Sequence, residues 1–126
     1  QEGQPDLQAL EKRATGGDTE AQMLLGRAYD EGLGVPQDRK KAAEWFMKAA
    51  AQGVPEAQFN LGALLYNGAA GEPPLAEVYQ WWTLAALQGH PSAQQNLEAV
   101  ARRLSREQLK AAQAAVAGVL RHQEKV

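Results

Sequence analysis

The side chains that most often carry out catalysis or bind metal ions are few in this sequence, and they stand far apart. Histidine occurs only at His90, in a Gly-His-Pro segment, and at His122, near the C-terminal end, so no pair of metal-binding histidines is evident. Cysteine is absent, which excludes disulfides, thiolate metal sites and cysteine nucleophiles within this chain. We expect both histidines to lie at the surface.

The common catalytic motifs are also missing. Neither Ser92 nor Ser105 begins a Ser-x-x-Lys sequence, and no His-Glu-x-x-His, Gly-x-Ser-x-Gly or Gly-Lys-Ser/Thr motif appears. The Gly-Leu-Gly-Val-Pro-Gln segment at 32–37 lacks the third glycine and the preceding strand of a dinucleotide-binding loop. We therefore predict that the chain is not an enzyme, with no catalytic residue, no cofactor and no metal.

The composition is that of a globular protein with few features for nucleic acids or membranes. Hydrophobic residues make up 44% of the 126 residues and charged residues 22%, with a net charge of −2. The longest basic run is Arg-Lys-Lys at 39–41, which offers little support for sequence-independent nucleic-acid binding. No apolar run approaches the ~20 residues that span a bilayer. We expect one domain over 1–126, no nucleic-acid partner and no membrane insertion.

A repeat of 36 residues organises the chain. Residues 20–53 align with 56–89 without a gap and share eleven identities, where chance would give roughly two. The same shift relates the Pro-Glu-Ala-Gln-Phe-Asn-Leu segment at 55–61 to Pro-Ser-Ala-Gln-Gln-Asn-Leu at 91–97. A fixed period of this length predicts stacked supersecondary units.

Each unit divides into a first helix, which we call the A helix, and a second, the B helix. We expect A helices over 19–31, 55–67 and 91–103, and B helices over 38–52 and 74–88, joined by turn-rich segments at 32–37 and 68–74. The flanks add a B-like helix over 5–16 and a capping helix over 105–122. The repeat units thus cover about 20–55 and 56–91, with partial units at 5–19 and 92–104.

The final helix is assigned from its own pattern. Ser105 and Gln108 have the spacing of a capping box. A single apolar stripe follows, which would cover the exposed core of the last unit; it consists of Leu109, Ala112, Val116, Val119 and Leu120. Seven helices and no strand signal predict an all-α fold, an α/α superhelix or solenoid with a C-terminal capping helix.

Two glycines stand in the middle of A helices, although glycine there costs about 1 kcal/mol relative to alanine. Gly26 and Gly62 occupy equivalent positions of the repeat, which indicates a repeated packing requirement. We expect each to face the small and bulky side chains of a B helix, so that the two backbones approach closely. In the first unit these side chains are Ala42, Trp45, Phe46, Ala49 and Ala50, and we expect the Trp45 ring to be in the core.

Residues 20–53 resemble the Sel1-like repeat, a relative of the tetratricopeptide repeat. The matching residues are Ala21, Gln22, Leu25, Gly26, Tyr29, Gly32, Gly34, Val35, Asp38, Lys41, Ala42, Trp45, Lys48, Ala49, Ala50, Gln52 and Gly53. The second unit departs from the pattern at Leu65, at 70–74 and at Val78, and the resemblance covers about residues 6–104. It implies a helical superhelix that binds proteins or peptides, mostly on a concave face lined by the A helices.

Some cysteine-rich members of that family are associated with penicillin binding or β-lactamase activity. The absence of cysteine and of a Ser-x-x-Lys motif means that this activity is not carried over to the present chain.

The side of each A helix opposite its core stripe is the expected partner-binding face, by similarity to tetratricopeptide proteins. Its residues are Met23, Leu24, Arg27, Asp30, Phe59, Asn60, Ala63, Tyr66, Gln95, Asn96 and Arg102. Phe59 and Tyr66 would act as apolar anchors, while Asn60 and Asn96 occupy equivalent positions suited to clamping a peptide backbone. In the alternative interpretation, Met23 and Phe59 pack between adjacent A helices and the charged residues are simply solvated.

The charge of this face changes along the stack. It runs from Glu20, Asp30 and Glu31 at one end to Arg102 and Arg103 at the other, which would orient a ligand with two oppositely charged ends.

The function predicted from these features is that of a non-catalytic adaptor for a protein or peptide partner. Two alternatives stay open: a cell-wall (peptidoglycan) binding module or β-lactamase-like enzyme, and a dimerising structural spacer, since the oligomeric state is unknown. The chain starts at Gln1 instead of Met, so either a leader was removed or the N-terminus was trimmed. With the family resemblance, this suggests a bacterial periplasmic or secreted protein, and a cytoplasmic location also stays open.

Overall fold

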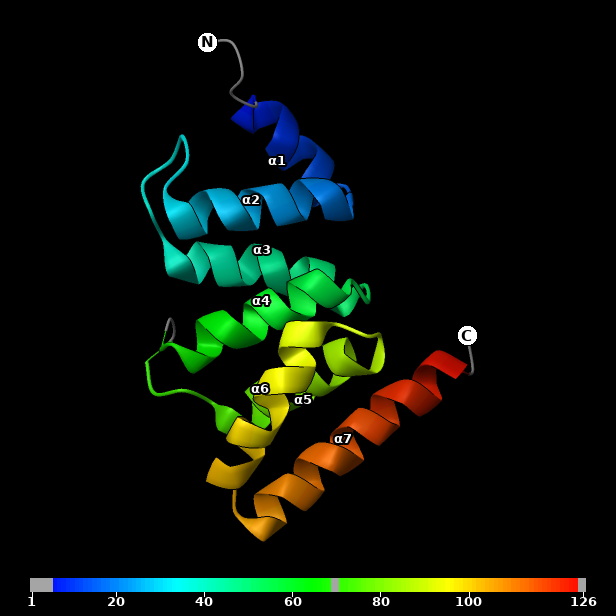
Figure 1. Ribbon diagram of the computed structural model, residues 1–126. Helices are drawn as coiled ribbons and strands as arrows, with labels where there is room; N and C mark the ends of the chain where they lie inside the picture. Colours follow the sequence, from blue (N-terminus) through cyan, green and yellow to red (C-terminus); the bar gives the residue numbers. More distant parts are fainter. Residues whose placement is uncertain (1–5, 69–70, 125–126) are drawn as a thin grey trace.

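The computed structural model describes residues 6–68 and 71–124, and within them it contains seven α-helices and no strand (Figure 1). The helices are α1 (Leu7–Thr15), α2 (Thr19–Glu31), α3 (Arg39–Ala51), α4 (Pro55–Tyr66), α5 (Leu75–Leu87), α6 (Pro91–Arg103) and α7 (Arg106–Glu124). The predicted all-α solenoid is confirmed, with α2, α4 and α6 as A helices and α3 and α5 as B helices. Residue 5 of the expected first helix and residues 69–70 of the expected second turn lie outside the described residues.

Local sequence signals explain where the helices begin. Asp18 caps α2 by accepting a hydrogen bond from the Ala21 amide at 3.1 Å, and Asp38 caps α3 in the same way. Proline is the first residue of α4 and of α6, where its missing N–H leaves no intrahelical bond unmade. The bond from Ala21 and the adjacent Arg13 guanidinium lower the pKa of Asp18 below its ordinary value.

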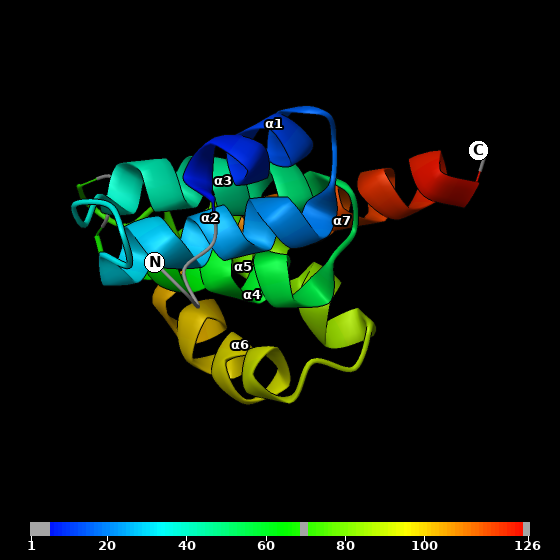
Figure 2. The same cartoon turned by 90° about the horizontal axis from the view of Figure 1, so that it is seen from above.

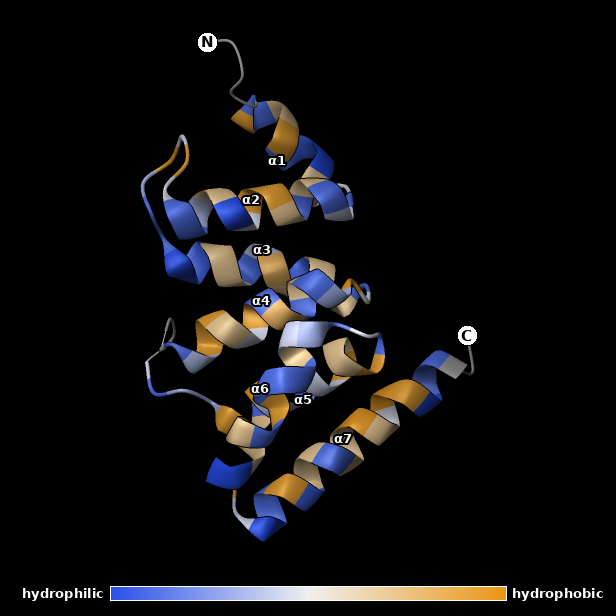
Figure 3. Ribbon diagram, in the orientation of Figure 1, coloured by the Kyte–Doolittle hydropathy of each residue, from blue (hydrophilic) through white to orange (hydrophobic). Residues whose placement is uncertain are grey.

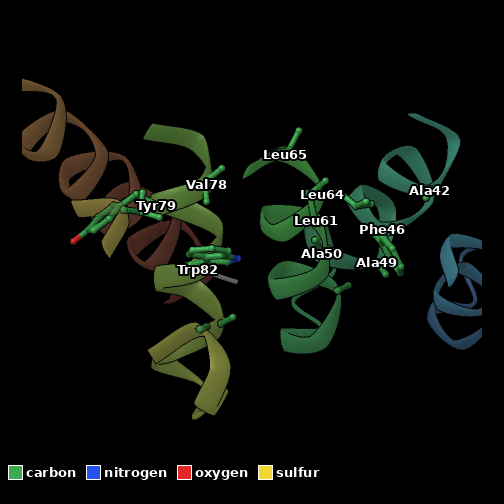
Figure 4. Packing of buried hydrophobic residues seen from close by; sticks show 14 of the residues in the cluster. Ala42, Phe46, Ala49, Ala50, Leu61, Leu64, Leu65, Val78, Tyr79 and Trp82 are labelled. Carbon is green, nitrogen blue, oxygen red and sulfur yellow. The ribbon is translucent and has the colours of Figure 1, made fainter. Parts of the chain in front are cut away.

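Consecutive helices pack against one another from α1 to α6, which produces the layered stack seen in Figure 1. The core lies between α3, α4 and α5, where the side chains labelled in Figure 4 gather around Phe46, Leu61 and Trp82. A smaller cluster joins α1 to α2 through Leu10 and Leu25. Each helix mixes hydrophilic and hydrophobic residues (Figure 3), and among the described helices none combines the length and the apolar character needed to cross a membrane.

The glycines of the A helices face the B helices, as expected. A Cβ atom added to Gly26 would lie 2.6 Å from the Phe46 ring, and one added to Gly62 would overlap the Trp82 indole. Each glycine therefore makes room for a buried aromatic ring.

The expectation that the Trp45 ring is in the core was correct only in part, because Trp45 packs against the small cluster of α1 and α2 but is not fully buried. Trp45 and its repeat equivalent Trp81 are only half-buried, and the Lys48 ammonium lies 5.8 Å from the centre of the Trp45 ring. The ring that packs against each A-helix glycine belongs instead to the next residue in the chain, Phe46 in the first unit and Trp82 in the second, and both are buried. A one-residue step along a helix turns a side chain by about 100°, which is enough to move it from the core to its edge.

The last helix leaves this pattern. The positions 36 residues after Gly62 and Trp82 are Glu98 and Gly118, so the glycine–aromatic pair is not repeated. Helix α7 packs mainly against α5, and its C-terminal end projects beyond the other helices in both Figure 1 and Figure 2.

The predicted apolar stripe of α7 is buried only in part. Ala112 and Val116 are buried, whereas Val119 and Leu120 are exposed, which corrects the expectation that the whole stripe would be covered. The cause is length: α7 has 19 residues and α5 only 13, and α5 ends at Leu87.

A ladder of glutamine side chains links neighbouring repeats. The buried Gln22 side chain donates to the Ala14 carbonyl at 2.9 Å, and the buried Gln58 donates to the Ala50 carbonyl at 3.2 Å. Gln52 in turn donates to the Gln22 side chain. Two further bonds repeat this geometry one unit later, from Gln88 to Gln58 and from Gln94 to Ala86. These bonds give a physical reason for the repeated glutamines of the sequence, because a buried carboxamide needs partners.

Candidate functional site: a groove across the A helices

Two hollows lie between successive A helices. The first has a volume of about 660 Å³ and lies between α2 and α4, over α3. Its walls are mostly polar and comprise Arg27, Asp30, Glu31, Arg39, Phe46, Glu56, Asn60, Ala63, Leu64 and Asn67. Asp30 lies 3.7 Å from Arg39 across this hollow.

The second hollow has a volume of about 270 Å³ and lies between α4 and α6, over α5. It is lined by Phe59, Ala63, Tyr66, Asn67, Trp82, Asn96, Ala99 and Val100. The two hollows share Ala63 and Asn67, so they adjoin each other on either side of α4 and together extend over α2, α4 and α6. We call the two hollows together the A-helix groove and the smaller one the aromatic pocket.

Three rings form one wall of the aromatic pocket. The ring centroid of Trp82 is 5.6 Å from that of Phe59 and 5.6 Å from that of Tyr66. The Trp82 indole N–H donates to the Phe59 carbonyl at 3.1 Å. The Arg103 guanidinium lies 5.5 Å from the centre of the Tyr66 ring and places a positive charge at the edge of the pocket.

His90 supports this wall from behind and is not at the surface, which corrects the expectation from sequence. Its side chain is 11% exposed and its ring stacks on Phe59 at 4.6 Å. Its Nδ1 accepts the Ala93 amide hydrogen at the start of α6, and its Nε2 lies 2.8 Å from a Glu56 carboxylate oxygen. The predicted surface position of His122 agrees with the structure.

The structure brings most of the predicted partner-binding residues together. Seven of the eleven line the A-helix groove, namely Arg27, Asp30, Phe59, Asn60, Ala63, Tyr66 and Asn96. Met23 packs against the core, as the alternative interpretation proposed for it. Leu24 and Gln95 are exposed away from the two hollows, and Arg102 forms an exposed ion pair with Glu98 at 3.0 Å.

Phe59 and Tyr66 contribute both to the core and to the expected partner-binding face. Each is half-buried and packed against the core, and each also lines the aromatic pocket.

Three residues around the site were missed. Trp82 was overlooked because the identity of Trp45 with Trp81 drew attention to the neighbouring position. Arg39 lines the groove from a B helix, outside the helices considered. His90 aligns with Asp18 at a shift of 72, which is two repeat lengths, and that alignment with a helix cap was the available signal. Within residues 6–68 and 71–124, no three acidic or histidine side chains gather closely enough to hold a metal ion.

Comparison with known proteins identifies the repeat. The model of the Sel1 repeat family matches residues 19–54 and again residues 55–90. The chain belongs to the Sel1 repeat family. No curated protein matches the chain closely.

Two solved structures of Sel1 repeat proteins resemble the chain. One is c5321, a protective antigen of uropathogenic Escherichia coli strains that displays an SLR fold, with 31% identity and a TM-score of 0.80 over 87% of this chain. The other is a Sel1 repeat protein from Oxalobacter formigenes, with 35% identity and a TM-score of 0.67 over 72% of this chain. The chain spans only 24% and 37% of the lengths of these two proteins. Sel1 repeat proteins are in general non-catalytic scaffolds that mediate protein interactions.

Proposed function

We propose that this chain is a non-catalytic adaptor that binds an extended segment of a partner protein in the A-helix groove. The observation that carries the proposal is the pair of adjoining hollows between three successive A helices, with apolar rings and carboxamides along their walls. An interface needs both components, because apolar burial supplies affinity and polar groups set the register.

The carboxamides favour an extended segment over a folded surface. Asn60 and Asn96 are equivalent residues of successive A helices, and both line the groove. A carboxamide donates and accepts hydrogen bonds, so each can pair with the N–H and C=O groups of a backbone. An extended chain has such groups available, whereas a helix has already used most of its own.

Charge supplies a direction for the bound segment. Asp30, Glu31 and Glu56 outnumber Arg27 and Arg39 in the hollow at the α2 end, while Arg103 lies beside the α6 end. A segment with a basic residue at one end and an acidic residue at the other would bind in one orientation, because the reverse would bring like charges together.

The test compares two substitutions on neighbouring residues of α6. Asn96→Arg places a bulky charge in the groove, and Gln95→Arg places the same group on the exposed helix surface outside it. Both residues are exposed, so both variants should keep the wild-type circular dichroism spectrum and unfolding midpoint. Partners captured by the wild type should be recovered by Gln95→Arg and lost by Asn96→Arg, as quantified by mass spectrometry.

Equal recovery of every partner by the two variants would reject the groove as the binding site. If the wild-type chain sediments together with purified peptidoglycan in a parallel assay, a cell-wall-binding role would be supported instead.

We further propose a periplasmic or secreted location. The similarity to a protective antigen of a uropathogenic bacterium supports it. Fractionation of cells that express the tagged native gene tests this location, and recovery of the protein with cytoplasmic markers would contradict it.

A further inference from the structure

We infer that the aromatic pocket binds one large apolar side chain of the partner segment, and that an aspartate or glutamate next to it in sequence pairs with Arg103. This inference rests on the proposed function and names the chemistry of the partner. It follows from the size of the pocket, the rigidity of its wall and the charge at its edge.

The size of the pocket suits a single side chain. Its volume of about 270 Å³ is less than half of the 660 Å³ of the neighbouring hollow. The small side chains of Ala63 and Ala99 leave the space open, while Trp82 and Val100 below them are almost fully buried. An aliphatic or aromatic side chain entering this space would bury part of its apolar surface against these residues, and burial of apolar surface is the main source of affinity in such pockets.

The wall of the pocket is held in place before any partner arrives. The indole N–H of Trp82 is hydrogen-bonded to the Phe59 carbonyl, and the Phe59 ring stacks with both the Trp82 ring and the His90 ring. His90 is itself fixed by its bonds to Glu56 and to the Ala93 amide. A preformed pocket binds more tightly than a flexible one, because fewer side chains must be ordered on binding.

The edge of the pocket favours a negative charge. The Arg103 guanidinium lies 5.5 Å from the centre of the Tyr66 ring, which lines the pocket, although Arg103 itself lines a separate hollow next to the start of α5. The neighbouring Arg102 is paired with Glu98, whereas the Arg103 guanidinium is in contact with the ring of Tyr66. Because a guanidinium binds a carboxylate through two parallel hydrogen bonds, an acidic residue beside the apolar one is the complementary partner.

Polar side chains at the rim of the pocket can bind the backbone of the partner segment. Asn67 and Asn96 line the pocket and are exposed, so their carboxamides can bond the backbone on either side of the inserted side chain.

The experiment selects peptides from a library of random linear sequences displayed on phage, with the wild-type chain as bait. We expect enrichment of sequences in which a Leu, Ile, Met or Phe is next to an Asp or Glu. One selected peptide, labelled and with both ends blocked, is then titrated against variants by fluorescence polarisation.

Two matched pairs of variants separate the pocket from the rest of the groove. Ala99→Leu fills the pocket and should weaken binding roughly 10- to 100-fold, the loss expected when an apolar side chain is excluded, whereas Gln95→Leu outside the groove should have no effect. Arg103→Glu should weaken binding about 5-fold or more and shift a new selection toward basic neighbours. Arg106→Glu, an equal change of charge on the exposed surface of α7, should change neither.

The outcomes separate this inference from the proposed function. If Asn60→Arg abolishes peptide binding while Ala99→Leu and Arg103→Glu bind the peptide normally, the groove remains the binding site. The inference that the aromatic pocket holds an apolar side chain is then refuted. Selection of apolar residues with no acidic neighbour, or unchanged preferences in Arg103→Glu, would overturn the role of Arg103. If no selected peptide responds to any groove variant, both proposals fail.

Discussion

Replacing Gly62 by alanine tests the packing on which the repeat depends. In an exposed helix interior this change stabilises a protein by about 1 kcal/mol, because alanine has the higher helix propensity. At Gly62, however, the new Cβ would lie 2.5 Å from Cδ1 of Trp82, against an ordinary carbon–carbon contact of about 3.5–4.0 Å. The indole ring would have to move by about 1 Å.

The expected magnitude follows from what holds the ring. Overpacking in a core costs about 1–3 kcal/mol, and moving the ring also strains the bond of its N–H to the Phe59 carbonyl, worth about 1 kcal/mol. After subtraction of the helix-propensity gain, Gly62→Ala should lower the free energy of unfolding by roughly 1–3 kcal/mol.

Gly118 provides the matched control. It also lies inside a helix, but the nearest atom to an added Cβ is a guanidinium nitrogen of Arg121 at 4.0 Å. Gly118→Ala should therefore raise the free energy of unfolding by about 0.5–1 kcal/mol. Urea denaturation followed by far-ultraviolet circular dichroism measures both variants without relying on tryptophan fluorescence.

A second background identifies the ring as the cause. In a Trp82→Leu variant the indole is gone, so adding Gly62→Ala should be neutral or stabilising, which gives a coupling of at least about 1 kcal/mol in the double-mutant cycle. If Gly62→Ala stabilises the wild type as much as Gly118→Ala does, the reasoning about close helix approach is refuted.

The remaining predictions concern the ladder, a helix cap and the two types of aromatic residue. Gln58→Met keeps the side-chain length but removes the bonds of Gln58 to the Gln88 carboxamide and to the Ala50 carbonyl, which keep their bonds to the Leu84 carbonyl and the Gly53 amide; thermal or urea unfolding should show a loss of about 1–2 kcal/mol in the free energy of unfolding. Asp18→Asn should reduce the acid sensitivity of unfolding. The pKa of Asp18 is lower in the folded than in the unfolded chain. Its stabilising contribution to the free energy of unfolding is therefore present above the ordinary pKa of 3.8 and is lost as the pH falls through the folded-state pKa. An Asp18→Asn variant whose stability depends on pH as the wild type does over that range would contradict this. Phe46→Ala should lower the free energy of unfolding by about 3–5 kcal/mol and Trp45→Ala by clearly less, since only Phe46 is fully buried. Equal losses measured by calorimetry would contradict this difference in burial.

Much of the fold could be predicted because its signals are local and recur. The bounds of α2 and α6 agree with the residues expected from Asp18, from Pro91 and from the 36-residue period. Capping residues and prolines act within one turn of a helix, so they can be recognised without knowing what the helix packs against.

The composition of the groove was predictable in part for a similar reason. Residues on one face of an A helix stay on one face wherever the helix is placed, so Asn60, Ala63 and Phe59 were expected to lie near one another. Which of the expected residues meet across helices was not predictable, because this depends on the angle at which α4 and α6 cross α5.

The sequence by itself determined the repeat, its helices, its family and the glycines that let those helices approach, because each of these depends on residues close together in the chain or related by a constant spacing. Only the tertiary structure decided that Trp82 and not Trp81 fills the core, that His90 supports Phe59, and that Arg103 stands beside Tyr66. These arrangements join residues from different helices, and their geometry is set by how side chains of particular volume fill the space between helices.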